Sequence, residues 1–399
     1  MAENKTKLWN RDFIIILLVQ FCLQMGQQML NTLVPLLADS LGAAASVIGL
    51  ISSIFSIAAT VVLIFVTPAF DCYSRKKTMM ISIAVTAIAF AGYGITGSIG
   101  TLLVFRLLQG ASSGSIMALG LVMVSDTLPD DKLGKGISVF TLCQAVAQAV
   151  GPGIGIAMKD SLGFSMTFFI GTGAVVLGLV FCAFIRESRK LEGSYRLSPD
   201  RIIAVEAIPA SVLVLILQGA YCCISSFIAI YGGLRGVGEI GLYFTVYAIG
   251  LLATRPVCGS LVDKIGHEVV LIFGMAFFAL SFFVISISDT LWLFLLSAVF
   301  SALGYGVCQP TLNYMVMRCV PPERRGAASC TSNIAMSIGF LVAVTGAGYI
   351  VDMLEAATGD LTLAYSRMYL IMILPVVLAL AYFVAARRKI NETIAKAHN

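Results

Sequence analysis

Charged residues are scarce in this 399-residue sequence, in which only 12 % are Asp, Glu, Lys or Arg. A soluble protein carries about twice that share and uses those charges to cover the surface that faces water. Hydrophobic residues make up 59 % of the chain, and the mean hydropathy is +0.95. This composition excludes a soluble enzyme, a nucleic-acid-binding protein and a disordered scaffold, and it indicates that the lipid bilayer surrounds most of the chain.

Histidine is also rare, since only His267 and His398 are present, and the ten cysteines contain no C-x-x-C pair. Zinc sites need clustered Cys and His ligands, so we predict no metal site, and no cofactor is expected. Residues 110–114 match the G-x-S-x-G pattern of serine hydrolases, but neither histidine lies in an apolar run where it could act as the base. We therefore expect no enzyme and interpret these glycines as positions of close helix packing.

Long apolar runs, in contrast, are abundant. A helix needs about 20 apolar residues to cross ~30 Å of hydrocarbon, and twelve runs have that length. We predict an all-α membrane protein whose twelve transmembrane helices cover residues 13–37, 46–69, 78–98, 100–124, 136–158, 164–185, 209–231, 240–262, 269–288, 290–316, 327–351 and 363–386. The first run is interpreted as a span rather than a secretory signal, because it is too long and contains four glutamines.

Basic residues are unevenly distributed between the connecting segments. If the amino terminus is cytoplasmic, 21 of the 26 Lys and Arg residues fall in the tails and cytoplasmic loops, and three fall in the outside loops. Short cytoplasmic loops of membrane proteins carry such an excess of positive charge. We predict a multi-pass protein of the cytoplasmic membrane with both termini in the cytoplasm, and its net charge of +5 reflects this orientation.

The sequence repeats itself once, in two halves of six spans. A polar interval predicts a cytoplasmic linker over residues 187–208, between helical bundles at 1–186 and 209–399. The halves align at an offset of 192 residues, which matches Asp71 with Asp263, Gly114 with Gly306 and Pro129 with Pro321. Tandem six-span halves enclose a cavity at their interface, and rocking of one half against the other alternates its access. We predict two pseudo-symmetric bundles that act as a carrier rather than as a channel.

Two polar loops follow the second and eighth spans at equivalent positions. They read Thr67-Pro-Ala-Phe-Asp71-Cys-Tyr-Ser-Arg75 and Gly259-Ser-Leu-Val-Asp263-Lys264-Ile-Gly266-His267. The second resembles the signature loop G-x-x-x-D-[RK]-x-G-R-[RK] of the major facilitator superfamily except at His267, and the first departs from it at Thr67, Cys72 and Ser74. An acid with several bases at a helix end can hold two helices in one conformational state. The predicted gating residues in these loops are Asp71, Arg75, Asp263 and Lys264.

The fourth span extends this resemblance. Arg106, Gln109 and Gly110 match an R-x-x-Q-G segment that the family associates with coupling in its proton-driven members. An arginine at the bilayer centre costs at least ~2.5 kcal/mol, so Arg106 either faces protein and water or extends to the outer surface. Asp126 closes this span, and the resemblance implies that such an acid pairs with a base of the first signature loop, for which Arg75 is available.

The fifth span carries Gly151, Pro152 and Gly155, which match part of the G-x-x-x-G-P-x-x-G-G motif of exporters in the same family. Ala147 and Ile156 stand where the motif has glycine. Small residues allow close helix approach, and proline permits a kink. We predict a coupling or gating role for these three residues, with a general packing seam as the alternative.

Polar side chains recur at helical spacing on several predicted spans, and on the first span they lie at i, i+4, i+7 and i+11, along one face. Amides that face lipid would lack partners, so these groups meet other helices or a wet cavity. The resemblance implies that spans 1, 4, 5, 7, 8, 10 and 11 line the cavity. The predicted cavity residues are Gln24, Gln27, Asn31, Arg106, Gln109, Gln144, Gln148, Gln218, Tyr221, Tyr247, Arg255, Tyr305 and Gln309.

The chain most resembles the twelve-span drug:proton antiporters of the superfamily. This implies a secondary transporter that exports a small organic compound across the cytoplasmic membrane in exchange for protons, by alternating access. Two intramembrane arginines without a central carboxylate favour an anionic, zwitterionic or neutral substrate, and Asp71 and Asp126 are the acids placed to carry the proton.

Two alternatives stay open. The first is a proton-coupled importer or uniporter of a small organic anion or metabolite. The second is a membrane receptor or enzyme that does not transport, which would need a ligand domain or a catalytic cluster. The expected partners are the substrate, protons and the bilayer, without nucleic acid, and the protein is expected to be a monomer.

Overall fold

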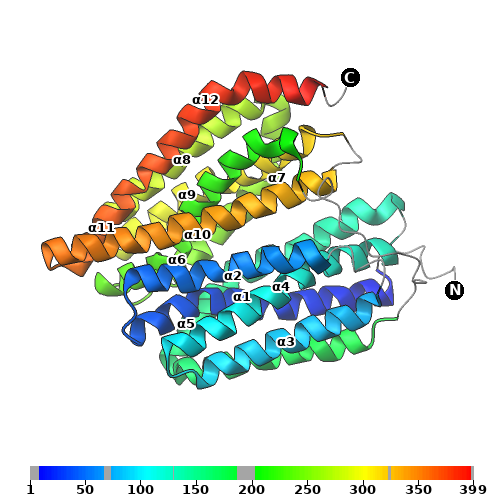
Figure 1. The fold of residues 1–399 in the computed structure, drawn as a ribbon, viewed down its shortest axis with the longest axis horizontal. Coiled ribbons are helices and arrows are strands. Elements are labelled where there is room, and N and C mark those ends of the chain that lie inside the picture. The colour runs from blue at the N-terminus through cyan, green and yellow to red at the C-terminus, as the bar shows by residue number, and fades with distance from the viewer. Residues whose placement is uncertain (1–8, 67–72, 129, 187–202, 322–324, 397–399) are drawn as a thin grey trace. The chain divides into compact units, whose positions relative to one another are not determined.

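The computed structural model describes residues 9–66, 73–128, 130–186, 203–321 and 325–396 (Figure 1). Throughout these residues the regular structure is helical. The helices are α1 Arg11–Ser40, α2 Ala45–Val66, α3 Arg75–Ile95, α4 Ile99–Thr127, α5 Asp130–Ala183, α6 Ile208–Leu234, α7 Leu242–Ile265, α8 His267–Ile287, α9 Leu291–Arg318, α10 Arg325–Thr358, α11 Leu361–Ile371 and α12 Ile373–Lys396, with a 3₁₀ turn at Val205–Ala207. The prediction of an all-α fold is confirmed.

The helices follow the order of the predicted spans with two differences. Helix α5 covers the fifth and sixth spans, which are separated by Gly163 with φ 79° and ψ 172°. The last predicted span is divided at Met372 into α11 and α12, because Pro375 in the first turn of α12 has no N–H to continue the helix. In the part of the chain that the structure describes, nine helical segments are long and apolar enough to cross a membrane.

Helix starts are specified locally where the sequence offers a cap. The Ser74 hydroxyl accepts a hydrogen bond from Lys77 N at the start of α3, and Ser98 accepts one from Thr101 N at the start of α4. Asp360 caps α11 in the same way. Such caps pair main-chain N–H groups that a helix cannot satisfy within itself.

The chain forms two compact units. The first comprises Met1–Leu37 and Ile54–Leu197, and the second comprises Ala38–Ser53 and Ser198–Asn399. Within the first, α3 packs on α4 and α5; within the second, α6 packs on α10, and α9 packs on both α7 and α8. The predicted domain limits at 186 and 209 stay a prediction, and most of the predicted linker lies outside the described residues.

In the first unit, α4 approaches α2 closely at two glycines. A Cβ added to Gly110 would lie 2.9 Å from Ala58 Cβ, and one added to Gly114 would collide with the carbonyl oxygen of Ala59. Any larger residue would force the helices apart. This confirms the interpretation of segment 110–114 as a packing element rather than a nucleophile.

In the second unit, α9 and α7 use the equivalent positions. A Cβ added to Gly250 would lie 2.5 Å from Ala302 Cβ, and one added to Gly306 would collide with Leu251 Cδ2. The 192-residue offset relates Ala58 to Gly250, Gly110 to Ala302, Ala59 to Leu251 and Gly114 to Gly306. The internal repeat is therefore also a repeat of helix packing. In the pair Ala58–Gly110 the glycine is on α4, whereas in the equivalent pair Gly250–Ala302 it is on α7, the counterpart of α2.

Helices α6 and α10 also contact each other closely at glycines in the second unit. A Cβ on Gly219 would lie 2.5 Å from Gly339 O and 2.8 Å from Ala343 Cβ, and a Cβ on Gly339 would collide with Leu215 O. A Cβ on Gly346, which is on the same helix, would meet nothing within 4 Å.

We predict that Gly339→Ala lowers the free energy of unfolding by about 1–3 kcal/mol, because the methyl group must displace the α6 backbone. Gly346→Ala is the control and should leave stability unchanged or raise it by about 0.5–1 kcal/mol, as expected for alanine in a helix. Denaturant titration of the purified protein in detergent measures both. Equal effects of the two substitutions would contradict the role assigned to Gly339.

Candidate functional site

Arg106 on α4 is buried in the first unit, with 2 % of its surface exposed. Its Nη1 donates to Gln109 Oε1 at 2.9 Å, and the Tyr93 hydroxyl donates to the same oxygen at 2.5 Å. The guanidinium lies over the Phe55 ring at 4.8 Å from its centroid. Arg106 therefore does not extend to the surface, and neutral polar and aromatic groups hold its charge inside the protein.

The same network continues from α4 to α1. Gln109 Nε2 donates to Gln27 Oε1 at 3.1 Å, and Gln27 Nε2 donates to Asn31 Oδ1 at 3.2 Å. Ser113 Oγ donates to Gln27 Oε1 at 3.4 Å. Four of the predicted cavity residues, on two helices, thus belong to one hydrogen-bonded group. The amides of this group form hydrogen bonds between α1 and α4. That they contact substrate stays a prediction.

The other candidates of the first unit lie on α1 and α5. Gln24, Gln144 and Gln148 are half-buried. A Cβ on Gly151 would lie 2.8 Å from Gln28 Cβ, and a Cβ on Gly155 would lie 3.0 Å from Met29 O. Gly151 and Gly155 of the partial exporter motif, with the buried Pro152 between them, therefore bring α5 into close contact with the polar helix α1.

The second unit contains a stack of three tyrosines from three helices. The rings of Tyr221 on α6 and Tyr305 on α9 are 4.4 Å apart and nearly parallel, at 2°. Tyr247 on α7 follows at 5.4 Å from Tyr221. The Tyr305 hydroxyl donates to Gln218 Oε1. Four more predicted cavity residues are thereby in one cluster.

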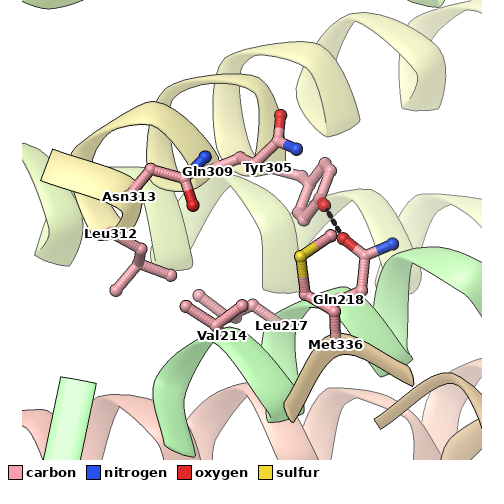
Figure 2. A pocket seen from close by; sticks show the side chains of 8 residues that line it. All are labelled: Val214, Leu217, Gln218, Tyr305, Gln309, Leu312, Asn313 and Met336. Atoms are coloured by element: carbon pink, nitrogen blue, oxygen red, sulfur yellow. Dashed lines mark hydrogen bonds between the residues drawn. The ribbon is translucent and has the colours of Figure 1, made fainter. Parts of the chain in front are cut away.

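A small hollow lies beside this stack, between α6, α9 and α10 (Figure 2). Its lining consists of Val214, Leu217, Gln218, Tyr305, Gln309, Leu312, Asn313 and Met336. Val214, Leu217 and Leu312 supply an apolar surface, and three amides supply hydrogen-bonding groups. Gln218, Tyr305 and Gln309 are among the predicted cavity residues, and Asn313 lies one helical turn after Gln309 on α9.

The structure describes only some of the charged residues that are predicted to act in gating or coupling. Arg75 is the first residue of α3 and is half-buried. Asp71 lies outside the described residues. So do the side chains of Asp126 at the end of α4 and of Arg255, Asp263 and Lys264 on α7. Their predicted roles stay predictions.

His267, where the second signature loop departs from its pattern, contacts the last helix. His267 Nε2 lies 3.1 Å from Asn391 Oδ1, and Asn391 Nδ2 donates to Glu268 Oε1 at 2.6 Å. Arg387 lies 3.7 Å from the other carboxylate oxygen of Glu268. The cluster connects the start of α8 to α12, which gives this histidine a structural role within the second unit.

Asp352 on α10 was not singled out from the sequence. Within the second unit its two carboxylate oxygens accept hydrogen bonds from Ala45 N at 2.8 Å and Ser46 N at 3.1 Å. Helix α2 begins at Ala45, after Ala43 and Ala44, whose side chains cannot cap a helix, so a distant carboxylate accepts the hydrogen bonds of its first N–H groups. The sequence shows that α2 has no capping side chain before it, but it does not show that Asp352 accepts these hydrogen bonds instead.

We predict that Gln109→Leu destabilises the first unit by about 1–3 kcal/mol, because Tyr93 and the Arg106 charge lose a shared buried acceptor. Gln24→Leu, on a half-buried position of α1, is the comparison and should cost less. Thermal or denaturant unfolding of the purified variants measures the difference. A Gln109→Leu protein as stable as the parent would show that the network does not hold α4.

Comparison with known proteins gives a consistent result. The family model of the Major Facilitator Superfamily matches residues 16–238 and 210–398. The staphylopine export protein of Staphylococcus aureus is 22 % identical over 78 % of this chain and 83 % of its own length. The multi-drug resistance efflux pump PmrA homolog of Lactococcus lactis is 25 % identical, over 88 % of this chain and 91 % of its own.

Among solved structures, the nucleoside transporter NupG superposes with a TM-score of 0.76 at 15 % identity, covering 94 % of this chain and 98 % of NupG. At this identity the match establishes the fold alone. The family model, in contrast, matches nearly the whole chain, in two overlapping segments. The chain therefore belongs to the major facilitator superfamily and is a multi-pass secondary transporter of the membrane, not an enzyme.

Proposed function

We propose that this transporter exports a small organic compound across the cytoplasmic membrane in exchange for protons, as drug:proton antiporters do. The observation that carries the proposal is the concentration of polar side chains, a buried arginine among them, inside helices that are otherwise apolar. Polar and ionisable groups within a membrane are costly and mark substrate or ion pathways. A purely structural helical bundle would not need them.

The first unit supports this proposal through the Arg106 network. A buried guanidinium with neutral neighbours provides a fixed positive charge within a membrane protein. The second unit supports it through a small hollow lined by amides and apolar side chains. Ligand pockets combine an apolar lining with a few polar groups in this way.

The direction of transport is supported by two observations. The partial exporter motif at Gly151, Pro152 and Gly155 packs against α1, the helix that carries the longest polar stripe. In addition, the staphylopine exporter and the multidrug efflux pump are similar to this chain over most of their lengths. Export rather than import is the function that both favour.

The repeated construction supports alternating access as the mechanism. Two units with equivalent glycine packing at an offset of 192 residues are suited to move as rigid bodies around a shared substrate site. We propose that the moving parts are the bundles at 1–186 and 209–399, that both termini are cytoplasmic, and that the monomer is the functional form.

Everted membrane vesicles test the direction of transport. With a compound identified by comparing cells that contain and lack the protein, an acidic vesicle interior should drive the compound into the vesicles. A protonophore is the control and should abolish this accumulation. Loss of preloaded compound from the vesicles under the same gradient would instead identify an importer and refute export.

Asp126 is the proposed proton carrier, so we predict that Asp126→Asn abolishes accumulation driven by the pH gradient while expression stays intact. A neutral amide cannot bind and release a proton near neutral pH. Asp160→Asn is the control, since Asp160 is an exposed carboxylate that pairs only with its neighbour Lys159 among the described residues.

Accumulation in the same vesicles provides the measurement for both variants. Unchanged accumulation by Asp126→Asn would remove Asp126 from the mechanism.

A further inference from the structure

The hydrogen-bond network around Arg106 has a direction, and the guanidinium imposes it. Arginine has hydrogen-bond donors and no acceptor, so the amide of Gln109 must turn its oxygen toward Arg106. The Tyr93 hydroxyl donates to the same oxygen, whose two lone pairs are thereby both used. The nitrogen of Gln109 therefore points the other way and donates to Gln27 on α1.

The same orientation continues along α1. The Gln27 oxygen accepts hydrogen bonds from Gln109 and Ser113. Its nitrogen consequently faces Asn31 and donates to Oδ1 at 3.2 Å, and Asn31 Nδ2 donates in turn to Gln28 Oε1. Each amide accepts on the side of the buried cation and donates on the far side. Because bonds in such a chain polarise one another, part of the positive charge is passed across α1.

The far end of this amide chain can bind a further group. The bonds lengthen from 2.9 Å at Arg106 to 3.5 Å between Asn31 Nδ2 and Gln28 Oε1, which is at the weak end of the range. Asn31 and Gln28 are both half-buried. Among the residues that the structure describes, the Gln28 nitrogen has no hydrogen-bond partner. The N–H groups of these two amides are therefore available to an outside acceptor.

Helix α5 holds this end of the chain in place. A Cβ on Gly151 would lie 2.8 Å from Gln28 Cβ, and a Cβ on Gly155 would lie 3.0 Å from Met29 O. The backbones of α1 and α5 are thus in close contact beside Gln28. The available donors are on a packed part of the first unit, so little ordering is needed before they bind.

We infer that the N–H groups of Asn31 and Gln28 bind an anionic group of the substrate, such as a carboxylate or sulfonate, in the positive field of Arg106. A cation would meet donors and a like charge there, whereas an anion gains charge-assisted hydrogen bonds. The inference rests on the proposed function, because it names the charge of the substrate part that the first unit binds. It does not depend on the direction of transport.

Thiol modification measures the local charge before any substrate is identified. Gln28→Cys, in a full-length background without the native cysteines, places a thiol beside the Asn31 donor. The probes are sulfonatoethyl methanethiosulfonate, an anion, and trimethylammonioethyl methanethiosulfonate, a cation. Relative to the rates with a small thiol in solution, the purified protein should favour the anion at least about tenfold. No preference, a preference for the cation, or a thiol that reacts with neither probe would overturn the inference.

A pair of carboxylate substitutions assigns the preference to Arg106. Gln109→Glu keeps an acceptor for Arg106 and Tyr93 but adds a negative charge beside the guanidinium. It should lower the anion preference of the Gln28→Cys protein at least about tenfold. Ser161→Glu adds the same charge at an exposed position of α5 and is the control, with an unchanged preference. Equal effects of the two substitutions would refute the assignment.

Asn31→Asp tests the donor itself, at a half-buried position where a carboxylate is tolerated better than at the buried Gln109. It replaces the N–H group with a negative charge and should also lower the anion preference at least about tenfold. An unchanged preference in this variant would show that Asn31 does not face the anion.

These rates are measured without a gradient, so they distinguish the inference from the proposed function. A protein that shows the anion preference but accumulates no compound in vesicles would retain the inference and refute proton-driven export. The opposite combination, with export intact and the preference absent, would refute the inference alone.

Discussion

The structure depends on one constraint, which is that polar groups inside a membrane must find their partners within the protein. In the first unit the constraint brings α1 and α4 together, because Gln109 donates a hydrogen bond to Gln27. Gln109 also accepts hydrogen bonds from Arg106 and Tyr93. In the second unit Gln218 and Tyr305 meet between α6 and α9. The same interactions that satisfy the polar groups also concentrate them away from lipid, which is where a transporter needs them.

Close helix packing makes these polar interactions possible. Glycine and alanine at equivalent positions of the repeat let α4 approach α2 and let α9 approach α7. Without a hydrophobic driving force between helices in lipid, such contacts and interhelical hydrogen bonds are what stabilise a bundle. The two units therefore combine a rigid small-residue framework with polar interiors that differ in chemistry, since one contains a buried cation and the side chains that line the hollow of the other are uncharged.

Hydropathy and periodicity predict the helices, the repeat and the polar faces that must contact other helices or a cavity. Each of these depends on residues close in sequence or on a constant offset. They do not predict which amide bonds which, since the Gln27–Gln109 contact depends on how α1 and α4 cross. The Asp352 cap of α2 was missed for the same reason: its partners are more than 300 residues away. The break at Met372 was visible in Pro375, whose missing N–H ends the preceding helix.

We propose that the polar side chains of both units face a water-accessible interior, while the apolar faces contact lipid. Labelling of single cysteines with a membrane-impermeant, charged thiol reagent, in a background without the native cysteines, measures this arrangement. Gln27→Cys and Gln309→Cys should react, whereas Ile88→Cys and Val342→Cys, at exposed apolar positions of α3 and α10, should not. Reaction at the apolar positions and protection of both polar ones would contradict it.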